Sequence, residues 1–203
     1  KRILYGRVGI DLFAGPTEIA IIADETADPR IVSIDLVGQA EHGPDSPVWF
    51  ITTSRELAEQ VASRMPGLIA DLPKIQSQAA EAAWRDFGEI ILVENDEEAI
   101  IEADKIACEH VEILTEDPRL YLDKMTNYGS MFLGPETNVS YGDKVIGTNH
   151  TLPTKGAARY TGGLWVGKFL KTVTYQECSE EASVMIADYC SRLCAIEKFW
   201  GHK

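Results

Sequence analysis

Short apolar runs alternate with amphipathic stretches along the first two thirds of the chain. The runs are four to six residues long and rich in β-branched side chains, which is typical of strands buried on both faces of a sheet. We predict strands at residues 19–23, 47–52, 89–93, 111–114 and 130–133. Because helical stretches separate them, the pattern predicts an α/β fold with a mostly parallel sheet and helices on both faces.

Helix-capping residues mark where the intervening helices begin. Asp28-Pro29 and Asp117-Pro118 each combine an N-cap side chain with a proline in the first turn. Thr53, with Glu56 three residues later, predicts a capping box. We predict helices at residues 28–41, from 53 onward, at 76–87 and 95–107, from 117 onward, and at 179–198. Residues 134–163 lack periodicity, and an irregular stretch of this length that contains tyrosines is typical of functional loops.

Composition narrows the class of protein. The chain has 203 residues, 45% of them hydrophobic, and a net charge of -13, which argues against a nucleic acid or an anionic membrane as partner. No apolar run approaches the roughly 20 residues of a membrane span, and no secretory signal opens the chain. We expect a cytoplasmic protein whose four cysteines are buried thiols. Because no initiator Met is present, we expect a processed chain or a fragment.

Two pairs of neighbouring polar residues are candidates for chemistry. Gln39 and His42 are three residues apart at the end of a predicted helix, and an imidazole with an amide oxygen can hold zinc. The alternative is an ordinary helix end with a dipole-favoured histidine. Glu109 and His110 form a general-base pair only at a strand end, because adjacent side chains within a strand point to opposite faces. The alternative is an exposed acid beside a half-buried histidine.

The irregular region and the tail supply further candidates. Asp143 and His150 lie on a glycine-bracketed loop, which suits metal or substrate contact but also a simple Asp turn. His202 follows the last helix, where a solvated tail is the alternative. A local basic cluster is either a solvated face or a site for an anionic substrate; it consists of Lys155, Arg159, Lys168 and Lys171. No glycine-rich phosphate loop or serine nucleophile elbow occurs.

Taken together, the motifs resemble the histidinol dehydrogenase family over nearly the whole chain. The matching stretches are residues 9–11, 14–18, 22–29, 39–46, 109–112, 142–143, 147–154 and 156–160. The resemblance implies a Rossmann-like fold with a C-terminal helical tail. It also implies oxidation of a primary alcohol to a carboxylate in two NAD-dependent steps through a retained aldehyde.

The resemblance also implies a site shared within a homodimer. Gln39, His42 and Asp143 would be zinc ligands, and the fourth ligand would be His202 supplied by the partner subunit. The two catalytic residues would each take part in a different proton transfer. Glu109 would activate water, and His110 would take the alcohol proton. The remaining residues implied to line the substrate site are Thr17, His150 and Glu197.

Three positions depart from the usual pattern of the family. Thr17 replaces a common Ser, Cys108 replaces a Pro, and Lys144 replaces a Tyr. These features resemble the branch that includes sulfopropanediol dehydrogenase, and a Lys144 ammonium could pair with a sulfonate. The substrate expected is therefore L-histidinol, giving L-histidine, or a small sulfonated diol such as 2,3-dihydroxypropane-1-sulfonate, giving sulfolactate.

The resemblance also implies how the chain is divided. Residues 1–18 would end a preceding Rossmann-like domain, residues 19–155 would form the main α/β domain, and residues 156–203 would form a crossover and a dimerisation tail. In the family most NAD contacts come from an N-terminal half, so we expect the 203-residue chain alone to be inactive. The alternative is a non-catalytic homologue or dimerisation module that kept the fold.

Overall fold

The computed structural model describes residues 1–202. The chain divides into two compact units, one ending at Lys168 and one beginning at Phe169. The two units are defined by contacts within one chain. They do not test the three domains expected from the sequence, which stay a prediction.

The first unit is built on a five-stranded sheet in which every neighbouring pair is parallel. The strand order is β3-β2-β1-β4-β5. The bounds are β1 Ile19–Ala23, β2 Val48–Thr52, β3 Gly88–Leu92, β4 His110–Leu114 and β5 Ser130–Leu133. The α/β fold with a parallel sheet is thus confirmed, and each predicted strand is present within one residue at either end.

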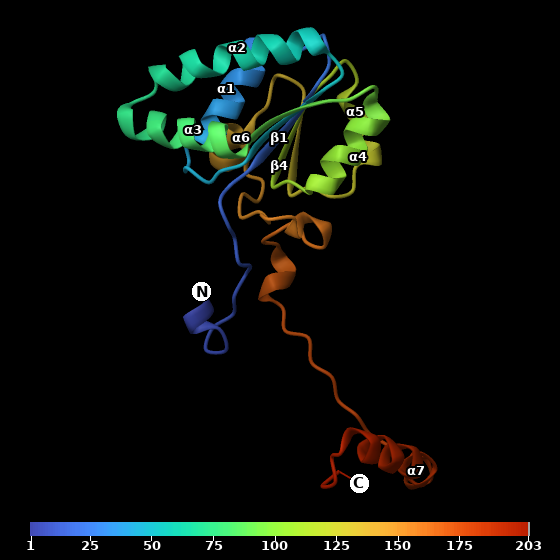
Figure 1. Ribbon diagram of the computed structural model, residues 1–203. Helices are drawn as coiled ribbons and strands as arrows, with labels where there is room; N and C mark the ends of the chain where they lie inside the picture. Colours follow the sequence, from blue (N-terminus) through green and yellow to red (C-terminus); the bar gives the residue numbers. More distant parts are fainter. Residues whose placement is uncertain (203) are drawn as a thin grey trace. The chain divides into compact units, whose positions relative to one another are not determined.

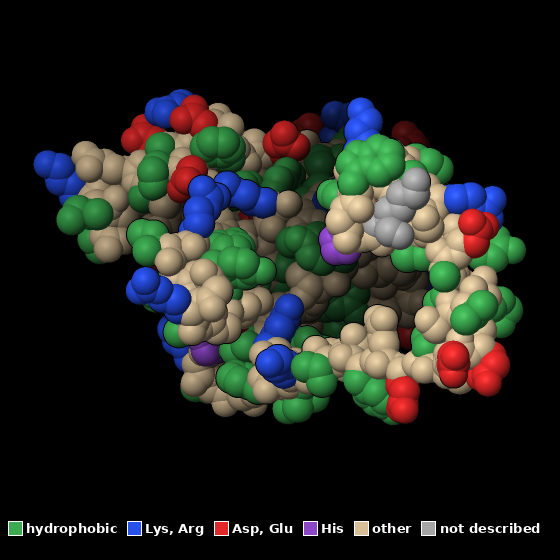
Figure 2. Space-filling view, turned by 90° about the horizontal axis from the view of Figure 1, so that it is seen from below, with side chains coloured by type: hydrophobic (Ala, Val, Ile, Leu, Met, Phe, Trp, Pro, Cys, Tyr) green, Lys and Arg blue, Asp and Glu red, His purple; other side chains and the backbone are tan. Residues whose placement is uncertain are grey.

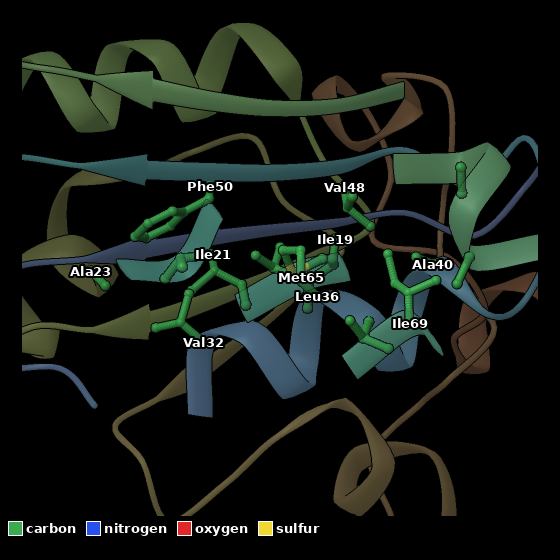
Figure 3. Close-up of a cluster of buried hydrophobic side chains, with 14 of the residues drawn as sticks. Ile19, Ile21, Ala23, Val32, Leu36, Ala40, Val48, Phe50, Met65 and Ile69 are labelled. Carbon is green, nitrogen blue, oxygen red and sulfur yellow. The ribbon is translucent and has the colours of Figure 1, made fainter. Parts of the chain in front are cut away.

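Helices cover both faces of this sheet (Figure 1). On one face lie α1 (Pro29–Ala40), α2 (Arg55–Asp71) and α3 (Lys74–Phe87), and on the other lie α4 (Asp96–Ile106) and α5 (Pro118–Lys124). Alternate residues of β1 enter the two cores, because successive side chains of a strand point to opposite faces. The first core joins Ile19 and Ile21 to α1 and α2, as Figure 3 shows, and the second holds Ala20 and Ile22.

Side-chain caps set the beginnings of the helices, as the sequence predicted in most cases. Asp28 accepts a hydrogen bond from the Arg30 backbone N–H at 2.7 Å, and Pro29 is the first residue of α1. The predicted cap of α2 is wrong by one residue. Ser54, not Thr53, is extended and accepts from the backbone N–H of Leu57 at 3.2 Å. Only a hydroxyl on the last residue before the helix can reach that donor. Because α2 begins at Arg55, this residue is Ser54.

Between β5 and Phe169 the chain forms only short helical turns. These are α6 (Val139–Tyr141), the π-helical turn η2 (Gly142–Ile146), and the 3-10 turns η3 (Ala157–Arg159) and η4 (Val166–Phe169); another 3-10 turn, η1 (Arg2–Leu4), lies near the N-terminus. Among the described residues, no helix is both long and apolar enough to cross a membrane.

The second unit contains one long helix, α7 (Glu180–Glu197), capped by Ser179. None of its residues is buried within this chain. Two of the four cysteines, Cys178 and Cys190, are exposed, so the expectation of four buried thiols is wrong for this chain and holds only for Cys108. Exposed hydrophobic side chains are frequent on the surface (Figure 2), and those of α7 include Val184, Tyr189 and Ile196.

Candidate functional site

The candidate residues gather at the amino-terminal edge of the sheet. Thr17 and Glu18 immediately precede β1, and Glu109 immediately precedes β4, which begins at His110. Ile19 and His110 are level in the paired parallel strands, so the residues that enter the two strands are neighbours. Helix α1 returns antiparallel to β1, and its C-terminal end therefore brings Gln39 to the same edge.

A chain of hydrogen bonds joins these residues across the two strands and the helix. Gln39 donates from Nε2 to Thr17 Oγ1 at 2.5 Å, and Thr17 donates in turn to Glu109 Oε2 at 2.6 Å. The backbone N–H of Glu18 donates to the same carboxyl oxygen at 3.1 Å. Gln39 and Glu109 are buried, so this network is fixed within the protein and not at its surface.

The His110 ring is buried beside the same carboxylate. Its Nδ1 lies 3.0 Å from the Glu18 carbonyl oxygen and 3.4 Å from Glu109 Oε2. Both of these atoms are acceptors, so Nδ1 carries the proton and Nε2 does not. Nε2 is buried without a hydrogen-bond partner in the described part of the chain. Burial lowers the pKa of His110, so the ring is neutral and Nε2 is free to take a proton.

Two further candidate residues, His42 and Asp143, influence Glu109 through their charges. Burial raises the pKa of Glu109, and the hydrogen bonds from Thr17 and Glu18 lower it. The charge of Asp143 raises the same pKa and the charge of His42 lowers it. Both side chains therefore lie within electrostatic range of Glu109, and their roles as ligands stay predictions.

Close packing after β5 brings Asp143 toward His110. A β-carbon added at Gly142 would lie 2.8 Å from Cε1 of Phe132, so only glycine lets turn η2 approach that ring so closely. Phe132 is in β5, and its ring centroid lies 6.1 Å from that of His110. Asp143 also raises the pKa of His110 through its charge. Lys144, the next residue, is exposed and has no ion pair or hydrogen bond within residues 1–202.

Other predicted residues are not brought into this network. His150 is exposed on its loop. Glu197 and His202 belong to the second unit, and their roles stay predictions. Within residues 1–202 no three His, Cys, Asp or Glu side chains are gathered as a metal site. The predicted zinc set supplies only His42 and Asp143 of those types within the first unit, so this observation does not test it.

Glu18 is the member that sequence reasoning missed as a functional residue. Its backbone N–H holds Glu109 and its carbonyl oxygen holds His110. Its own carboxyl is buried, which raises its pKa to about 7, while the Lys155 backbone N–H lowers that pKa and the charge of Glu109 raises it. The sequence did contain a signal for this role. Glu18 is a charged residue directly before β1, a strand whose five residues are all buried, so its side chain was bound to lie near the core.

A large cavity of about 660 Å³ flanks this edge. It lies between residues 11–13 and the segment 153–168, and its walls include Tyr160, Trp165 and Lys168. Thr154, in the second segment, accepts a hydrogen bond at Oγ1 from the backbone N–H of Gly15, two residues after the first segment, at 2.5 Å. The cavity therefore opens next to the segment that carries Thr17.

Comparison with known proteins gives the family of the chain. The family model described as histidinol dehydrogenase matches residues 1–203. A "histidinol dehydrogenase homolog" of Shouchella clausii is 62% identical over 203 residues, which are 100% of this chain and 47% of that protein. The "sulfopropanediol 3-dehydrogenase" of Ruegeria pomeroyi is 52% identical over 202 residues, again 100% of this chain and 46% of the relative.

The fold agrees with that of a solved relative. A crystal structure of histidinol dehydrogenase from Elizabethkingia anophelis matches with a TM-score of 0.75 and 36% identity, over 95% of this chain and 44% of that one. The chain thus spans about half the length of the relatives it matches. A match of the family model from the first residue to the last, supported by the same fold, is decisive: the chain belongs to the histidinol dehydrogenase family.

Proposed function

We propose that this chain carries the proton-transfer and metal-binding side chains of a zinc- and NAD-dependent alcohol dehydrogenase. The enzyme would oxidise a primary alcohol through a bound aldehyde to a carboxylate. The observation that carries the proposal is the buried Glu109–His110 pair, held beside Thr17, Glu18 and Gln39 by hydrogen bonds of 2.5–3.1 Å.

His110 is suited to take the proton of the alcohol. Its Nδ1 proton is directed at the Glu18 carbonyl oxygen, which fixes the tautomer and leaves Nε2 as the basic atom. Burial keeps the ring neutral, so it is ready to accept a proton at neutral pH. A buried nitrogen without a protein partner is also an atom whose hydrogen bond only a ligand or water can supply.

Glu109 is suited to activate water for the second oxidation. Two donors, Thr17 and the Glu18 backbone, hold its Oε2, so Oε1 is left to accept a proton. Burial raises its pKa and makes it a stronger base than an exposed carboxylate. The water that gives its proton to Glu109 would add to the aldehyde carbon and form the hydrate that is oxidised next.

The residues present fit a zinc ion. Gln39, His42 and Asp143 offer an amide oxygen, an imidazole nitrogen and a carboxylate, which are donor types that zinc accepts. Gln39 and His42 lie at the C-terminal end of α1, where the partial negative charge of the helix favours a cation. When bound, zinc and NAD supply Lewis-acid stabilisation of negative charge on the substrate oxygen and a hydride acceptor, respectively. The fourth ligand, His202 of a second copy in a homodimer, belongs to the proposal, as does a cytoplasmic location.

The substrate proposal rests on charge. Lys144 follows Asp143 and its ammonium is exposed and unpaired within the described residues, so it is free to pair with a sulfonate. A cationic substrate such as L-histidinol gains nothing from that charge. Because a relative that is 52% identical is named sulfopropanediol 3-dehydrogenase, we propose a small sulfonated diol as the substrate, with His150 and Glu197 lining the same site.

The test is NADH production by the zinc-loaded full-length gene product, with 2,3-dihydroxypropane-1-sulfonate and with L-histidinol. We expect turnover of the sulfonated diol and a loss in its kcat/KM of roughly 10-fold or more in Lys144→Tyr, the size of one partly exposed charge contact. Lys74→Tyr removes an equally exposed lysine from the start of α3 and serves as the control. An unchanged preference in Lys144→Tyr would remove the sulfonate assignment, and a protein without zinc or turnover would favour the non-catalytic homologue.

A further inference from the structure

The hydrogen bonds of the candidate site have a direction that follows from the chemistry of their groups. The carboxylate of Glu109 can only accept, and the Thr17 hydroxyl has one hydrogen to give. Because Thr17 Oγ1 lies 2.6 Å from Glu109 Oε2, that hydrogen is donated to the carboxylate. The Thr17 oxygen must therefore accept from its other neighbour, Gln39, at 2.5 Å.

This direction decides which way the Gln39 amide is turned. Only the NH2 end of the amide can donate to Thr17, so Nε2 faces the hydroxyl and Oε1 points away from it. The opposite orientation would set an amide oxygen against a hydroxyl whose hydrogen is already used, with no hydrogen between them. A flexible, buried glutamine is thereby held with its oxygen available to a cation.

The same hydroxyl also orients the carboxylate. Thr17 and the Glu18 backbone N–H both donate to Oε2 of Glu109, so the plane of the carboxyl is fixed and its other oxygen is the free one. Thr17 lies two residues before the start of β1, and its β-branch restricts the rotation that aims the hydroxyl. One side chain thus sets the orientation of both a proposed ligand and a proposed base.

We propose that Thr17 is a positioning residue, whose hydroxyl joins Gln39 to Glu109 and so turns the Gln39 oxygen toward the zinc ion. The proposal rests on the proposed function, because it assigns a cause to the geometry of that site. This role is separate from the substrate contact predicted for Thr17, because it does not need a substrate to be bound. Removal of the hydroxyl must then weaken zinc binding even when no substrate is present.

The test is the affinity of the full-length gene product for Zn²⁺, measured by competition with a chromophoric chelator without substrate. Thr17→Val keeps the shape but removes the hydroxyl, and we expect zinc affinity to fall about 10- to 100-fold, as when residues that orient metal ligands are removed. Thr17→Ser keeps the hydroxyl, and we expect affinity within about 3-fold of the unmodified protein. Thermal unfolding of each apo-protein checks that the fold is intact, and Thr17→Ala replaces the valine variant if that variant does not fold.

A double-mutant cycle with Gln39→Ala tests the route. If Thr17 acts through Gln39, Thr17→Val has little further effect on zinc affinity once the amide is absent. Equal zinc affinity in the unmodified protein and in Thr17→Val would overturn the inference, and so would a full additional loss in the Gln39→Ala background. An unmodified protein that binds no Zn²⁺ would instead overturn the proposed function.

Discussion

The two edges of the parallel sheet differ in chemistry, although β1 and β4 contribute to both. At the carboxyl-terminal edge, Asp24 accepts hydrogen bonds from the backbone N–H groups of Thr26 and Glu116, and Asp28 caps α1. At the amino-terminal edge, Glu109 and His110 are buried, and the Nε2 of His110 has no partner within residues 1–202. The polar groups of the carboxyl-terminal edge mostly form hydrogen bonds within the chain, whereas the amino-terminal edge has a buried polar atom available to a ligand.

The edge that carries the candidate site is the opposite of the one that binds ligands in most sheets of this type. Doubly wound sheets bind ligands at the carboxyl ends of their strands, where the strand order reverses, which here is between β1 and β4. A cavity of about 230 Å³ lies at that point, and one unpaired hydroxyl, that of Thr115, is buried there. However, Asp28 occupies the positive end of α1, so an anionic ligand is disfavoured. The negative end of the same helix is at the other edge, where it suits the cation that we propose.

The largest effect is expected when the proposed base at the amino-terminal edge, Glu109, is removed. Glu109→Gln keeps the size of the side chain but cannot take a proton, so we expect kcat to fall by roughly 10²- to 10⁴-fold in the full-length gene product. Steady-state NADH production measures this. Asp24→Asn is the matched change at the carboxyl-terminal edge, and we expect its kcat within about 2-fold of the unmodified protein. Equal losses in the two variants would mean that the edges do not differ in function.

A smaller effect concerns a buried acid between the two edges. Glu112 in β4 is fully buried, and its oxygens lack hydrogen bonds of standard geometry within the described residues. Burial, together with the neighbouring charge and hydrogen bonding of Asp35 in α1, raises its pKa from the ordinary value of 4.5 to about 9. The folded protein therefore keeps a proton that the unfolded chain loses, and stability declines as pH rises from about 4.5 to about 9.

Glu112→Gln removes that ionisation. At pH 8 we expect the variant to be more stable than the unmodified protein by on the order of 2–4 kcal/mol, with the difference vanishing near pH 5. Urea unfolding at several pH values measures it. Glu89→Gln, at an exposed position of β3, is the control and should change stability by less than about 0.5 kcal/mol. A difference that does not vary with pH would contradict the assignment of a shifted proton to Glu112.

The smallest effect is expected at the carboxyl-terminal edge, where Asp28 caps α1. Asp28→Ala removes the cap of α1, and we expect a loss of about 1 kcal/mol in the free energy of unfolding with kcat unchanged. Thermal unfolding and NADH production measure the two quantities. Asp28→Asn keeps an acceptor oxygen and should recover most of the stability. A large loss of activity in Asp28→Ala would place function at the edge that we regard as structural.

The helices and strands could be located from local patterns of residues. Strand β1 was predicted at its true bounds, because a β-branched apolar run reports burial directly. Asp28, Asn95 and Asp117 marked helix starts, because a cap is a contact between residues two or three positions apart. The same kind of evidence gave the wrong cap for α2, because Thr53 and Ser54 both carry a hydroxyl that could serve as the cap.

The assembly of the candidate site depends on contacts between residues far apart in the chain. Thr17 and Glu109 are 92 positions apart, and they meet because β1 and β4 are neighbours in a sheet whose order local periodicity does not encode. The sequence left open whether Glu109 and His110 face one site, and the start of β4 at His110 resolves it. The direction of the hydrogen bonds through Thr17 also depends on which groups face each other, which is a property of packing and not of the order of residues.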